Sequence, residues 1–355
     1  MNKKSVLIGM SGGVDSSVAA HLLQQDQYHC VGCTMRLYCC PGSSEDNVSD
    51  AKSVATRMGI PFHVFDFQEV FYHCVINHFI DSYESGITPN PCIQCNRFLK
   101  FGVMLDKALE LGCSYVATGH YAQIRKDDAT GRYLLYKAAD IAKDQTYFLY
   151  SLTQHQLSHT LFPLGGLTKE EAREIAEAQG FVTARKKDSQ DICFVPNGDY
   201  VAFMQEYTGK AYAPGNYLDL SGKVVGQHQG AVCYTLGQRK GLGIALGAPV
   251  YVCSKDMERN TVTVGPNEAL LHNALRARDW NWIPFPALTQ PIQVTAKIRH
   301  SQQEQSATVY PEENGYARVV FAAPQRAITP GQAVVLYQGN LVVGGGTITE
   351  GFTII

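Results

Sequence analysis

The N-terminal part of the chain alternates short apolar runs with stretches whose apolar residues recur every three or four positions. Apolar runs predict buried strands, and the wider spacing predicts amphipathic helices. The expected strands are residues 5–10, 30–37, 62–67 and 115–118, and the expected helices are residues 14–25, 46–58, 70–83 and 98–111. This alternation is typical of an α/β fold with a doubly wound parallel sheet, in which ligands bind at the carboxyl ends of the strands.

The pattern changes further along the chain. A helix is predicted over residues 168–179, where Thr168 and Glu171 have the spacing of a capping box. Beyond about residue 195, short alternating runs rich in Gly, Pro, Val and Tyr predict an all-β region with a small barrel. The run 280–286, with two tryptophans and two prolines, is expected to be a junction or loop. The expected strands of this region are residues 251–254, 261–264, 292–298, 317–321, 333–337 and 341–346.

Composition narrows the class of protein. Lys and Arg total 30 against 32 Asp and Glu, which excludes a strongly cationic protein but not a local basic face for nucleic acid. The apolar start is too short for a signal peptide, and no segment approaches the roughly 18 apolar residues of a membrane span. We therefore expect a cytoplasmic protein with no membrane partner. The 11 cysteines then favour reduced thiols, metal ligands or catalysis over disulfides.

A loop rich in glycine and serine follows the first predicted strand and opens the first predicted helix. Its sequence is Ser11-Gly12-Gly13-Val14-Asp15-Ser16-Ser17. Glycines let the backbone approach phosphate oxygens, and a helix N-terminus offers free N–H groups and the positive end of a dipole. The loop has neither the Gly-Lys-Ser/Thr of a Walker A motif nor a GxGxxG fingerprint. Its sequence resembles the signature of the PP-loop ATP pyrophosphatases, which activate an oxygen with ATP and release pyrophosphate.

Two cysteine segments far apart in the sequence indicate which kind of PP-loop enzyme this chain resembles. Cys95 follows two prolines in what is expected to be a loop before a helix, and a nearby helix N-terminus lowers the pKa of a thiol. Cys193 lies in a second polar, loop-like stretch just after Lys186 and Lys187. Two reactive thiols brought together by a fold suit sulfur transfer, in which one carries a persulfide and the other resolves it. Alternatively, each is a small buried apolar residue.

These segments, taken with others, resemble the bacterial family of tRNA-specific 2-thiouridylases over essentially the whole chain. The agreeing segments are GMSGGVDSS (9–17), TPNP…CN (88–96), ATGHYA (117–122), KDQTYFL (143–149), KDSQDICF (187–194), YTLGQRKGLGI (234–244) and TPGQAVVLY (329–337). The resemblance implies a PP-loop ATP-binding catalytic domain at 1–200, a small central domain at 201–275 and a C-terminal β-barrel at 276–355.

The resemblance also implies an activity. ATP, with Mg²⁺, would adenylate the C2 carbonyl oxygen of the wobble uridine of tRNA, with release of pyrophosphate. A persulfide on Cys193, charged by a sulfur donor protein, would then supply sulfur as AMP leaves, and Cys95 would be the nucleophile that releases it. This implies a transient disulfide between Cys95 and Cys193.

The resemblance assigns further residues to three groups. ATP would bind Gly9, Met10, Ser11, Gly12, Gly13, Val14, Asp15, Ser16, Ser17, Met35 and Gly119. The target base would lie against Asn90, Pro91 and Cys92. The rest of the tRNA would contact His120, Lys143, Asp144, Gln145, Arg299, His300 and Gln332.

Cys92 departs from the family pattern, in which many members carry Asp at this position. Cys is a poorer base at neutral pH, since its ordinary pKa is near 8.5. The change also creates a Cys92-x-x-Cys95 pair with Cys193 at a distance, and three thiolates can hold a [4Fe-4S] cluster. The thiolation chemistry is therefore either persulfide-based or cluster-based at this stage, with no other metal site expected.

Two other functions compete with thiolation. A different PP-loop adenylating enzyme would need no paired thiols, and one that amidates a small molecule would need an ammonia source. A sulfur carrier or redox sensor would use Cys95 and Cys193 but not the phosphate loop. The remaining cysteines are expected to be core or incidental positions, with zinc binding a minority alternative for Cys30, Cys33, Cys39 and Cys40.

Overall fold

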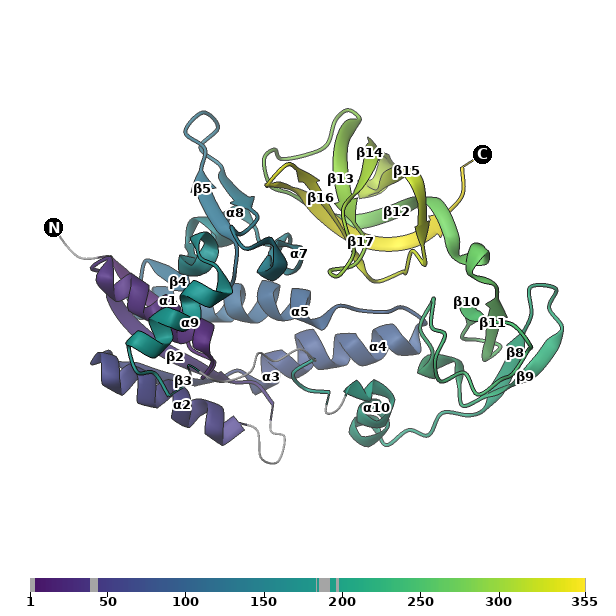
Figure 1. Cartoon of the computed structure of the whole chain (residues 1–355), viewed down its shortest axis with the longest axis horizontal. Helices are drawn as coiled ribbons and strands as arrows, with labels where there is room; N and C mark the ends of the chain where they lie inside the picture. The colour runs from purple at the N-terminus through teal and green to yellow at the C-terminus, as the bar shows by residue number, and fades with distance from the viewer. Residues whose placement is uncertain (1–3, 39–43, 183, 185–191, 196–197, 355) are drawn as a thin grey trace.

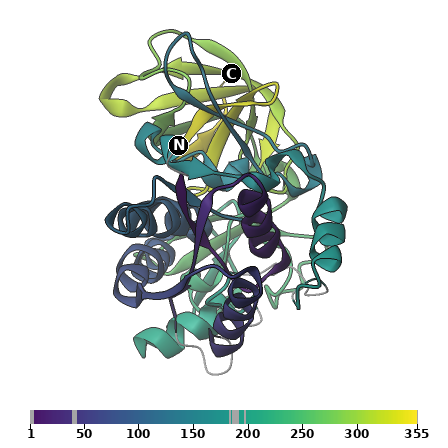
Figure 2. The same ribbon diagram turned by 90° about the vertical axis from the view of Figure 1, so that its left-hand side faces the viewer.

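The computed structural model describes residues 4–38, 44–182, 184, 192–195 and 198–354. Its strands form three sheets of five, four and eight strands. In Figure 1 the parallel sheet with its helices lies at the left, the closed sheet at the upper right and the four-stranded sheet at the lower right. Figure 2 shows the closed sheet stacked above the parallel sheet. The structure is therefore of the predicted α/β class, with an all-β C-terminal part.

The parallel sheet has the strand order β3-β2-β1-β4-β7. Its centre is apolar, since Val6, Leu7 and Ile8 of β1 are fully buried. The first four of these strands are predicted by the apolar runs, and only the two-residue β7 was missed. The strand bounds are β1 (Ser5–Gly9), β2 (His29–Arg36), β3 (Phe62–Asp66), β4 (Tyr115–Ala117) and β7 (Thr160–Leu161).

Helices cover both faces of this sheet (Figure 1). The helix α1 has the predicted bounds, and α9 begins with the capping box of Thr168 and Glu171 that the sequence predicts. The helical bounds are α1 (Val14–Gln25), α2 (Ser44–Met58), α3 (Gln68–Phe71), α4 (His78–Glu84), α5 (Pro91–Gln94), α6 (Met104–Glu110), α7 (Thr146–Leu149), α8 (Gln154–Ser158) and α9 (Lys169–Ala178). Two π-helical segments, η1 (Tyr72–Asn77) and η2 (Cys95–Val103), join α3 to α4 and α5 to α6.

One helix begins earlier than predicted. The elements α5, η2 and α6 follow one another without a break, so residues 91–110 form a continuous helix in place of the expected loop before residue 98. Pro91 is the first helical residue, a position where its fixed φ is favourable and no N–H is needed. The expectation of a loop at residues 88–96 is therefore wrong beyond Asn90, because Pro91 begins the helix and does not stiffen a loop before it.

The region after residue 195 is not entirely β. The helix α10 (Tyr200–Thr208) has Asp199 as its N-cap and Gly209 in the left-handed conformation at its C-terminus. It packs Phe203 and Met204 into the apolar core of the parallel-sheet region. The expectation of an all-β region was wrong for this segment. The four-stranded sheet follows with order β10-β11-β8-β9, formed by β8 (Gly215–Leu218), β9 (Val224–His228), β10 (Tyr251–Asp256) and β11 (Thr261–Gly265).

The C-terminal sheet closes into a barrel. Six strands run in the order β12-β15-β14-β13-β16-β17, and pairing of β17 with β12 closes the ring. The hairpin of β5 (Gln123–Lys126) and β6 (Tyr133–Tyr136) attaches to β17, so this sheet joins C-terminal strands to a hairpin from the first half of the chain. The barrel strands are β12 (Leu271–Trp282), β13 (Ile292–Lys297), β14 (Gln305–Pro311), β15 (Ala317–Arg326), β16 (Ala333–Gln338) and β17 (Leu341–Phe352).

The expected junction at 280–286 is only partly correct. Trp280 and Trp282 lie within the last three residues of β12, and their rings stack 4.7 Å apart against the barrel core. The strand was missed because its alternation is interrupted by irregular pairing, with Asp279 at φ 54°. The domain division at 1–200, 201–275 and 276–355 stays a prediction.

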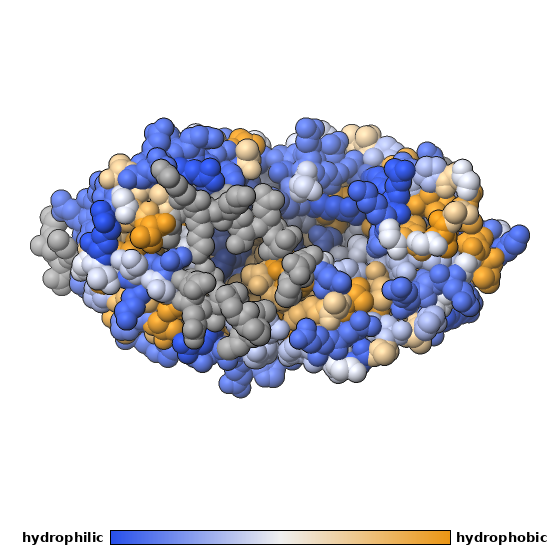
Figure 3. Space-filling view, turned by 60° about the horizontal axis from the view of Figure 1, so that its bottom comes forward, coloured by the Kyte–Doolittle hydropathy of each residue, from blue (hydrophilic) through white to orange (hydrophobic). Residues whose placement is uncertain are grey.

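One face of the surface is drawn by hydropathy in Figure 3. The face brought forward in Figure 3 is mostly hydrophilic, with separate apolar patches. Among the described residues, no helix is both long and apolar enough to cross a membrane.

Candidate functional site

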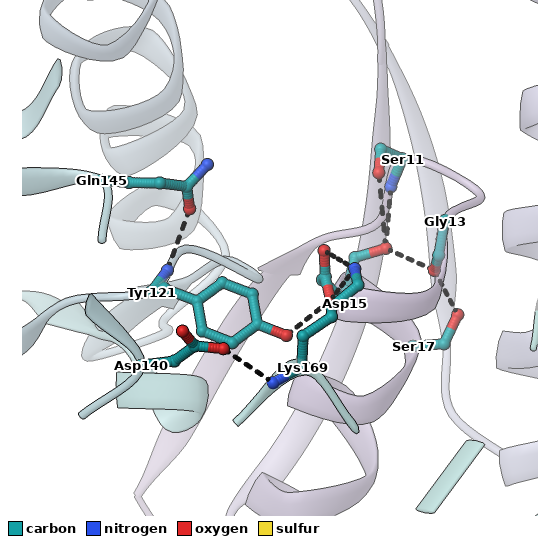
Figure 4. Close-up of polar contacts among 9 residues, drawn as sticks. Ser11, Gly13, Asp15, Ser17, Tyr121, Asp140, Gln145 and Lys169 are labelled. Atoms are coloured by element: carbon teal, nitrogen blue, oxygen red, sulfur yellow. Dashed lines mark hydrogen bonds and ion pairs between the residues drawn. The ribbon is translucent and has the colours of Figure 1, made fainter. Parts of the chain in front are cut away.

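The loop between β1 and α1 has the backbone of an anion-binding turn. Gly12 adopts φ 70°, and Gly13 is the N-cap in an extended conformation without a side-chain capping bond. The serines brace the turn, since the hydroxyl of Ser16 accepts from the N–H of Ser11 at 3.2 Å and the hydroxyl of Ser17 donates to the carbonyl of Gly13 at 2.9 Å (Figure 4). An uncapped helix N-terminus of this kind favours a phosphate group.

Asp15 is held by residues from two other segments. The Lys169 ammonium lies 2.8 Å from both carboxylate oxygens, and the Tyr121 hydroxyl donates to Oδ1 at 2.9 Å (Figure 4). The side chain of Gln145 in turn accepts from the backbone N–H of Tyr121. These bonds fix the first turn of α1 against α9 and the segment after β4, so Asp15 is part of the loop's framework. Lys169, which the sequence analysis missed, supplies the balancing charge.

Gly119 lies directly on the backbone of this first turn. A Cβ at this position would lie 2.6 Å from the carbonyl carbon of Asp15 and 2.7 Å from the N of Ser16. The position therefore excludes any side chain, which is a packing reason for glycine independent of ATP. The other residues expected at ATP lie around the same edge of the sheet: Gly9 ends β1, Met10 follows it with a buried side chain, and Met35 lies near the end of β2.

The predicted base-facing residues lie at the start of the helix formed by residues 91–110. Asn90 is its N-cap residue, Pro91 its first residue and Cys92 its second. Cys95 follows three positions on, so both thiols lie on one side of the helix. Cys92 is exposed and Cys95 is buried. The helix N-terminus is thus closer to Cys92 than to Cys95.

Cys193 lies near this pair despite its distance in sequence. Its thiol interacts electrostatically with Cys95, Cys92 and Lys100. The next residue, Phe194, is fully buried, with its ring 5.3–5.6 Å from the rings of Phe71 and Phe79 and so anchored in the core. Lys186 and Lys187, expected to act on this thiol, lie outside the described residues.

Cys95 and Cys193 are not the low-pKa groups that the sequence suggested, and the pKa of Cys92 is not lowered either. Burial raises the pKa of Cys95, and the nearby Cys92 raises it further, although Lys100 lowers it. The pKa of Cys92 is also raised. Loss of hydration, together with the other two thiols, raises the pKa of Cys193 to about 12. Cys92 and Cys193 are reached by solvent, yet protein atoms surround them closely enough to disfavour the thiolate. The expectation of a lowered pKa at Cys95 and Cys193 was wrong for this state.

Metal binding finds no support in the part of the chain that the structure describes. It contains no group of three or more His, Cys, Asp or Glu side chains arranged to hold a metal ion. Among the described residues, Cys92, Cys95 and Cys193 therefore do not form a ligand set for a cluster in this conformation. Burial of Cys30 and Cys33 raises their pKa to about 11 and about 12, as expected for core positions. Cys39 and Cys40 lie outside the described residues.

Two residues near the thiols matter more than the sequence indicated. Lys100 lies on the same helix, with its Nζ 3.4 Å from Nε2 of His120. Asn96 is almost fully buried and donates to the carbonyl of Phe148, while its Oδ1 has no partner among the described residues. The sequence signal for Lys100 is its place five positions after Cys95, which becomes informative once the helix is known to begin at Pro91.

Some of the residues expected to touch tRNA lie together, and several of them are already hydrogen-bonded within the protein. His300 lies beside the carbonyl of Asp144, with its ring 4.5 Å from that of Phe148, so the structure brings the segments 143–149 and 299–300 together. Lys143 and Gln145 lie beside Asp144 in that first segment. Several of these side chains are already bonded within the protein. The carboxylate of Asp144 accepts from Ala138 and Thr146, and Arg299 donates to Ala327 and Thr329.

Gln332 and His120 also have internal partners. Gln332 donates to the carbonyls of Thr88 and Pro89, just before the helix that carries the thiols. His120 is only 8% exposed and lies between Thr118 and Lys100. In this conformation the polar groups of Gln332 and His120 therefore bond to other parts of the protein, and these bonds hold the segments of the site together.

Comparison with known proteins gives consistent matches along the chain. The family model described as tRNA methyl transferase HUP domain matches residues 4–197, tRNA methyl transferase PRC-barrel domain matches 201–266, and Aminomethyltransferase beta-barrel domain matches 272–348. A relative from Acetivibrio thermocellus, named tRNA-specific 2-thiouridylase MnmA, is 50% identical over 98% of this chain and 100% of its own length. A relative of the same name from Symbiobacterium thermophilum is 52% identical over 97% of this chain and 92% of its own.

Similarity to solved structures is much weaker. A 4-thiouridine synthetase in complex with RNA and bound ATP is 17% identical with a TM-score of 0.36, over 58% of this chain and 50% of that one. A likeness of this size does not bear on function.

Proposed function

The chain belongs to the tRNA-specific 2-thiouridylase family, and from this premise we propose that it replaces the C2 oxygen of a wobble uridine in tRNA with sulfur at the expense of ATP. The observation that carries the proposal is that one fold combines two features. The thiols of Cys92, Cys95 and Cys193 lie near one another, and the loop between β1 and α1 suits a phosphate group. Neither a simple adenylating enzyme nor a sulfur carrier needs both features.

The first step uses the loop at residues 9–17. Free N–H groups at the start of α1 hold the ATP phosphates, and the turn itself is braced by Ser16 and Ser17. The C2 carbonyl oxygen of uridine attacks the α-phosphorus, the bond to the bridging oxygen breaks, and pyrophosphate leaves. Bound Mg²⁺ supplies neutralisation of phosphate charge, and it usually takes one or two carboxylates together with phosphate oxygens and water. Asp15 is the carboxylate at this turn, already shared with Lys169.

The second step uses the thiols. A persulfide on Cys193, charged by a donor protein, attacks C2 through its terminal sulfur, and AMP leaves with the former C2 oxygen. Cys95 then attacks the Sγ of Cys193, the sulfur–sulfur bond breaks, and the electron pair passes to the sulfur of 2-thiouridine. The Cys95–Cys193 disulfide so formed holds two oxidising equivalents, which an external thiol reductant removes before the next turnover. Asn90, Pro91 and Cys92 border the base at the start of the helix.

The remaining assignments complete the proposal. The tRNA lies across the segments 143–145 and 299–300. His120 and Gln332 hold the helix that carries the thiols and the segment before it. The protein works in the cytoplasm, where thiols stay reduced between turnovers. The persulfide route is preferred to a [4Fe-4S] route because it needs two thiols, and those of Cys95 and Cys193 interact with each other.

The decisive experiment combines the purified protein with unmodified wobble-uridine tRNA, ATP, Mg²⁺ and a persulfide donor, followed by nucleoside mass spectrometry. We expect 2-thiouridine only when ATP is present. Formation of no thionucleoside, aerobically or anaerobically, would reject the proposed function. Iron and acid-labile sulfide are measured on the anaerobically purified protein in parallel, and stoichiometric iron that is required for activity would reject the persulfide route.

A further inference from the structure

Lys100 lies on the same helix as two of the three thiols. The segment η2 (Cys95–Val103) is π-helical, so its backbone bonds join residues five apart, as from the N–H of Met104 to the carbonyl of Leu99. Lys100 follows Cys95 by five positions and therefore lies one wide turn further along the same side of the helix. Segments of π-helix within α-helices are frequent at functional sites.

A buried histidine fixes the end of this lysine. Burial and the nearby Lys100 hold the pKa of His120 well below its ordinary value, so its ring is neutral. A neutral ring has one donor and one acceptor nitrogen. The Lys100 ammonium donates to Nε2 at 3.4 Å, which leaves Nδ1 as the donor to the Thr118 hydroxyl at 2.7 Å. The chain Thr118–His120–Lys100 thus sets both the tautomer and the direction of the ammonium.

The charge of Lys100, held at His120, acts on all three thiols. No ion pair to a carboxylate is formed by Lys100 within the described ranges, and it interacts electrostatically with Cys92, Cys95, Cys193 and His120. For each of the three thiols the interaction lowers the pKa, against the larger effect of burial. By contrast, Lys107 further along the helix pairs with Glu110 at 2.6 Å at the surface.

We propose that Lys100, oriented by His120, is a positioning residue for sulfur transfer: its ammonium stabilises the sulfur anions of Cys95 and Cys193 as they form. This inference rests on the proposed function for its substrate. When Cys95 attacks Sγ of Cys193 and the sulfur–sulfur bond breaks, negative charge moves from one sulfur to another within the same small site. The fixed ammonium of Lys100 stabilises the negative charge on each sulfur in turn. It does not gain or lose a proton, and it affects the reaction through the thiols.

The test compares Lys100→Met with Lys100→Arg, and with Lys107→Met as the matched control on the same helix. Alkylation of Cys95 and Cys193 by iodoacetamide is followed peptide by peptide between pH 7 and 10, with no tRNA or ATP present. We expect Lys100→Met to alkylate roughly tenfold more slowly at each pH, as for a pKa raised by about one unit. Lys100→Arg should stay within about threefold of wild type, because it keeps the charge. Lys107→Met should match wild type.

A second readout follows the reaction. Lys100→Met should lose 2-thiouridine formation while its ATP-dependent pyrophosphate release on tRNA stays within about threefold of wild type. Should Lys100→Met fail to fold, His120→Leu, which removes the acceptor but keeps the lysine, should slow alkylation in the same direction. Unchanged alkylation profiles in the folded variants would overturn the inference, as would equal losses in the Met and Arg variants. Because alkylation needs no substrate, this result stands apart from whether wild type makes 2-thiouridine.

Discussion

The phosphate loop and the thiol site are built in opposite ways. The loop is a single short segment whose serines and glycines bond to one another, so most of its geometry is local. The thiol site instead combines a helix starting at Pro91, a turn anchored by Phe194, a histidine after β4 and a loop of the barrel. The loop is braced from within and meets distant residues at Asp15 and Ser16, whereas the thiol site has no such local brace and depends on every segment that reaches it.

The largest difference between the activities of the two regions is expected for Cys193→Ser. Serine carries no persulfide, so 2-thiouridine formation should fall below detection, at least 1,000-fold by the usual cost of losing a nucleophile, roughly 10⁴ or more. Pyrophosphate release should stay within about threefold of wild type, because the loop is untouched. Both are measured on the same tRNA, and parallel loss of the two activities would show that the regions are not separable.

The pH response should also belong to the thiol site alone. The pKa of Cys193 is raised to about 12, so its thiol is protonated at neutral pH and the thiolate fraction grows as pH rises toward that value. Alkylation of the free thiol should therefore increase about tenfold per pH unit from pH 7 to 9, roughly 100-fold in all. A plateau below pH 9, seen by peptide mass spectrometry, would contradict the raised pKa.

Gly119→Ala should damage the loop first. The added Cβ would lie 2.6–2.7 Å from backbone atoms of Asp15 and Ser16, so the first turn of α1 must shift. We expect pyrophosphate release to fall about 30-fold, with about 1–3 kcal/mol of stability lost to overpacking. Alkylation of Cys95 should change little. Calorimetry and the pyrophosphate assay check the two effects, and full activity would mean that the turn is less rigid than its contacts indicate.

Lys169→Met should have a smaller effect on the same region. It removes the ammonium that bonds both oxygens of Asp15, while Tyr121 keeps its bond. The loss of a charge-assisted bond predicts about 1–3 kcal/mol of lower stability and a several-fold weaker ATP affinity. Thermal unfolding and equilibrium nucleotide binding measure both. Arg173→Met, on the same helix, is the control that should change neither.

The smallest effect is expected at the barrel contact. Gln332→Ala removes two bonds to the carbonyls of Thr88 and Pro89, which lie before the thiol-bearing helix. About 1 kcal/mol of lost support predicts roughly a threefold rise in KM for tRNA, with pyrophosphate release at saturating tRNA unchanged. An effect confined to kcat would instead mean that the bonds position the thiols and not the RNA.

This contrast explains what the sequence could predict. The loop, the capping box at Thr168 and four of the five strands of the parallel sheet follow from local patterns, because near neighbours determine them. The helix start at Pro91 was missed because proline marks both the end and the beginning of helices. The roles of Lys100 and Lys169, and the contact of His120 with Lys100, could not be assigned from sequence, since the partners come from other segments. The raised thiol pKa values likewise depend on burial that only the assembled fold provides.

The docking of the barrel onto the segment before the catalytic helix has an evolutionary consequence. Pro330 accepts a bond from the N–H of Thr88, and a Cβ on Gly331 would lie 2.1 Å from Cγ2 of Ile87. The segments at residues 87–88 and 330–331 thus share one interface, which has no room for a side chain at Gly331. Positions 87 and 331 are therefore expected to vary together among relatives. If recombination exchanged only the C-terminal barrel between distant relatives, the side chains at these two positions would no longer fit each other.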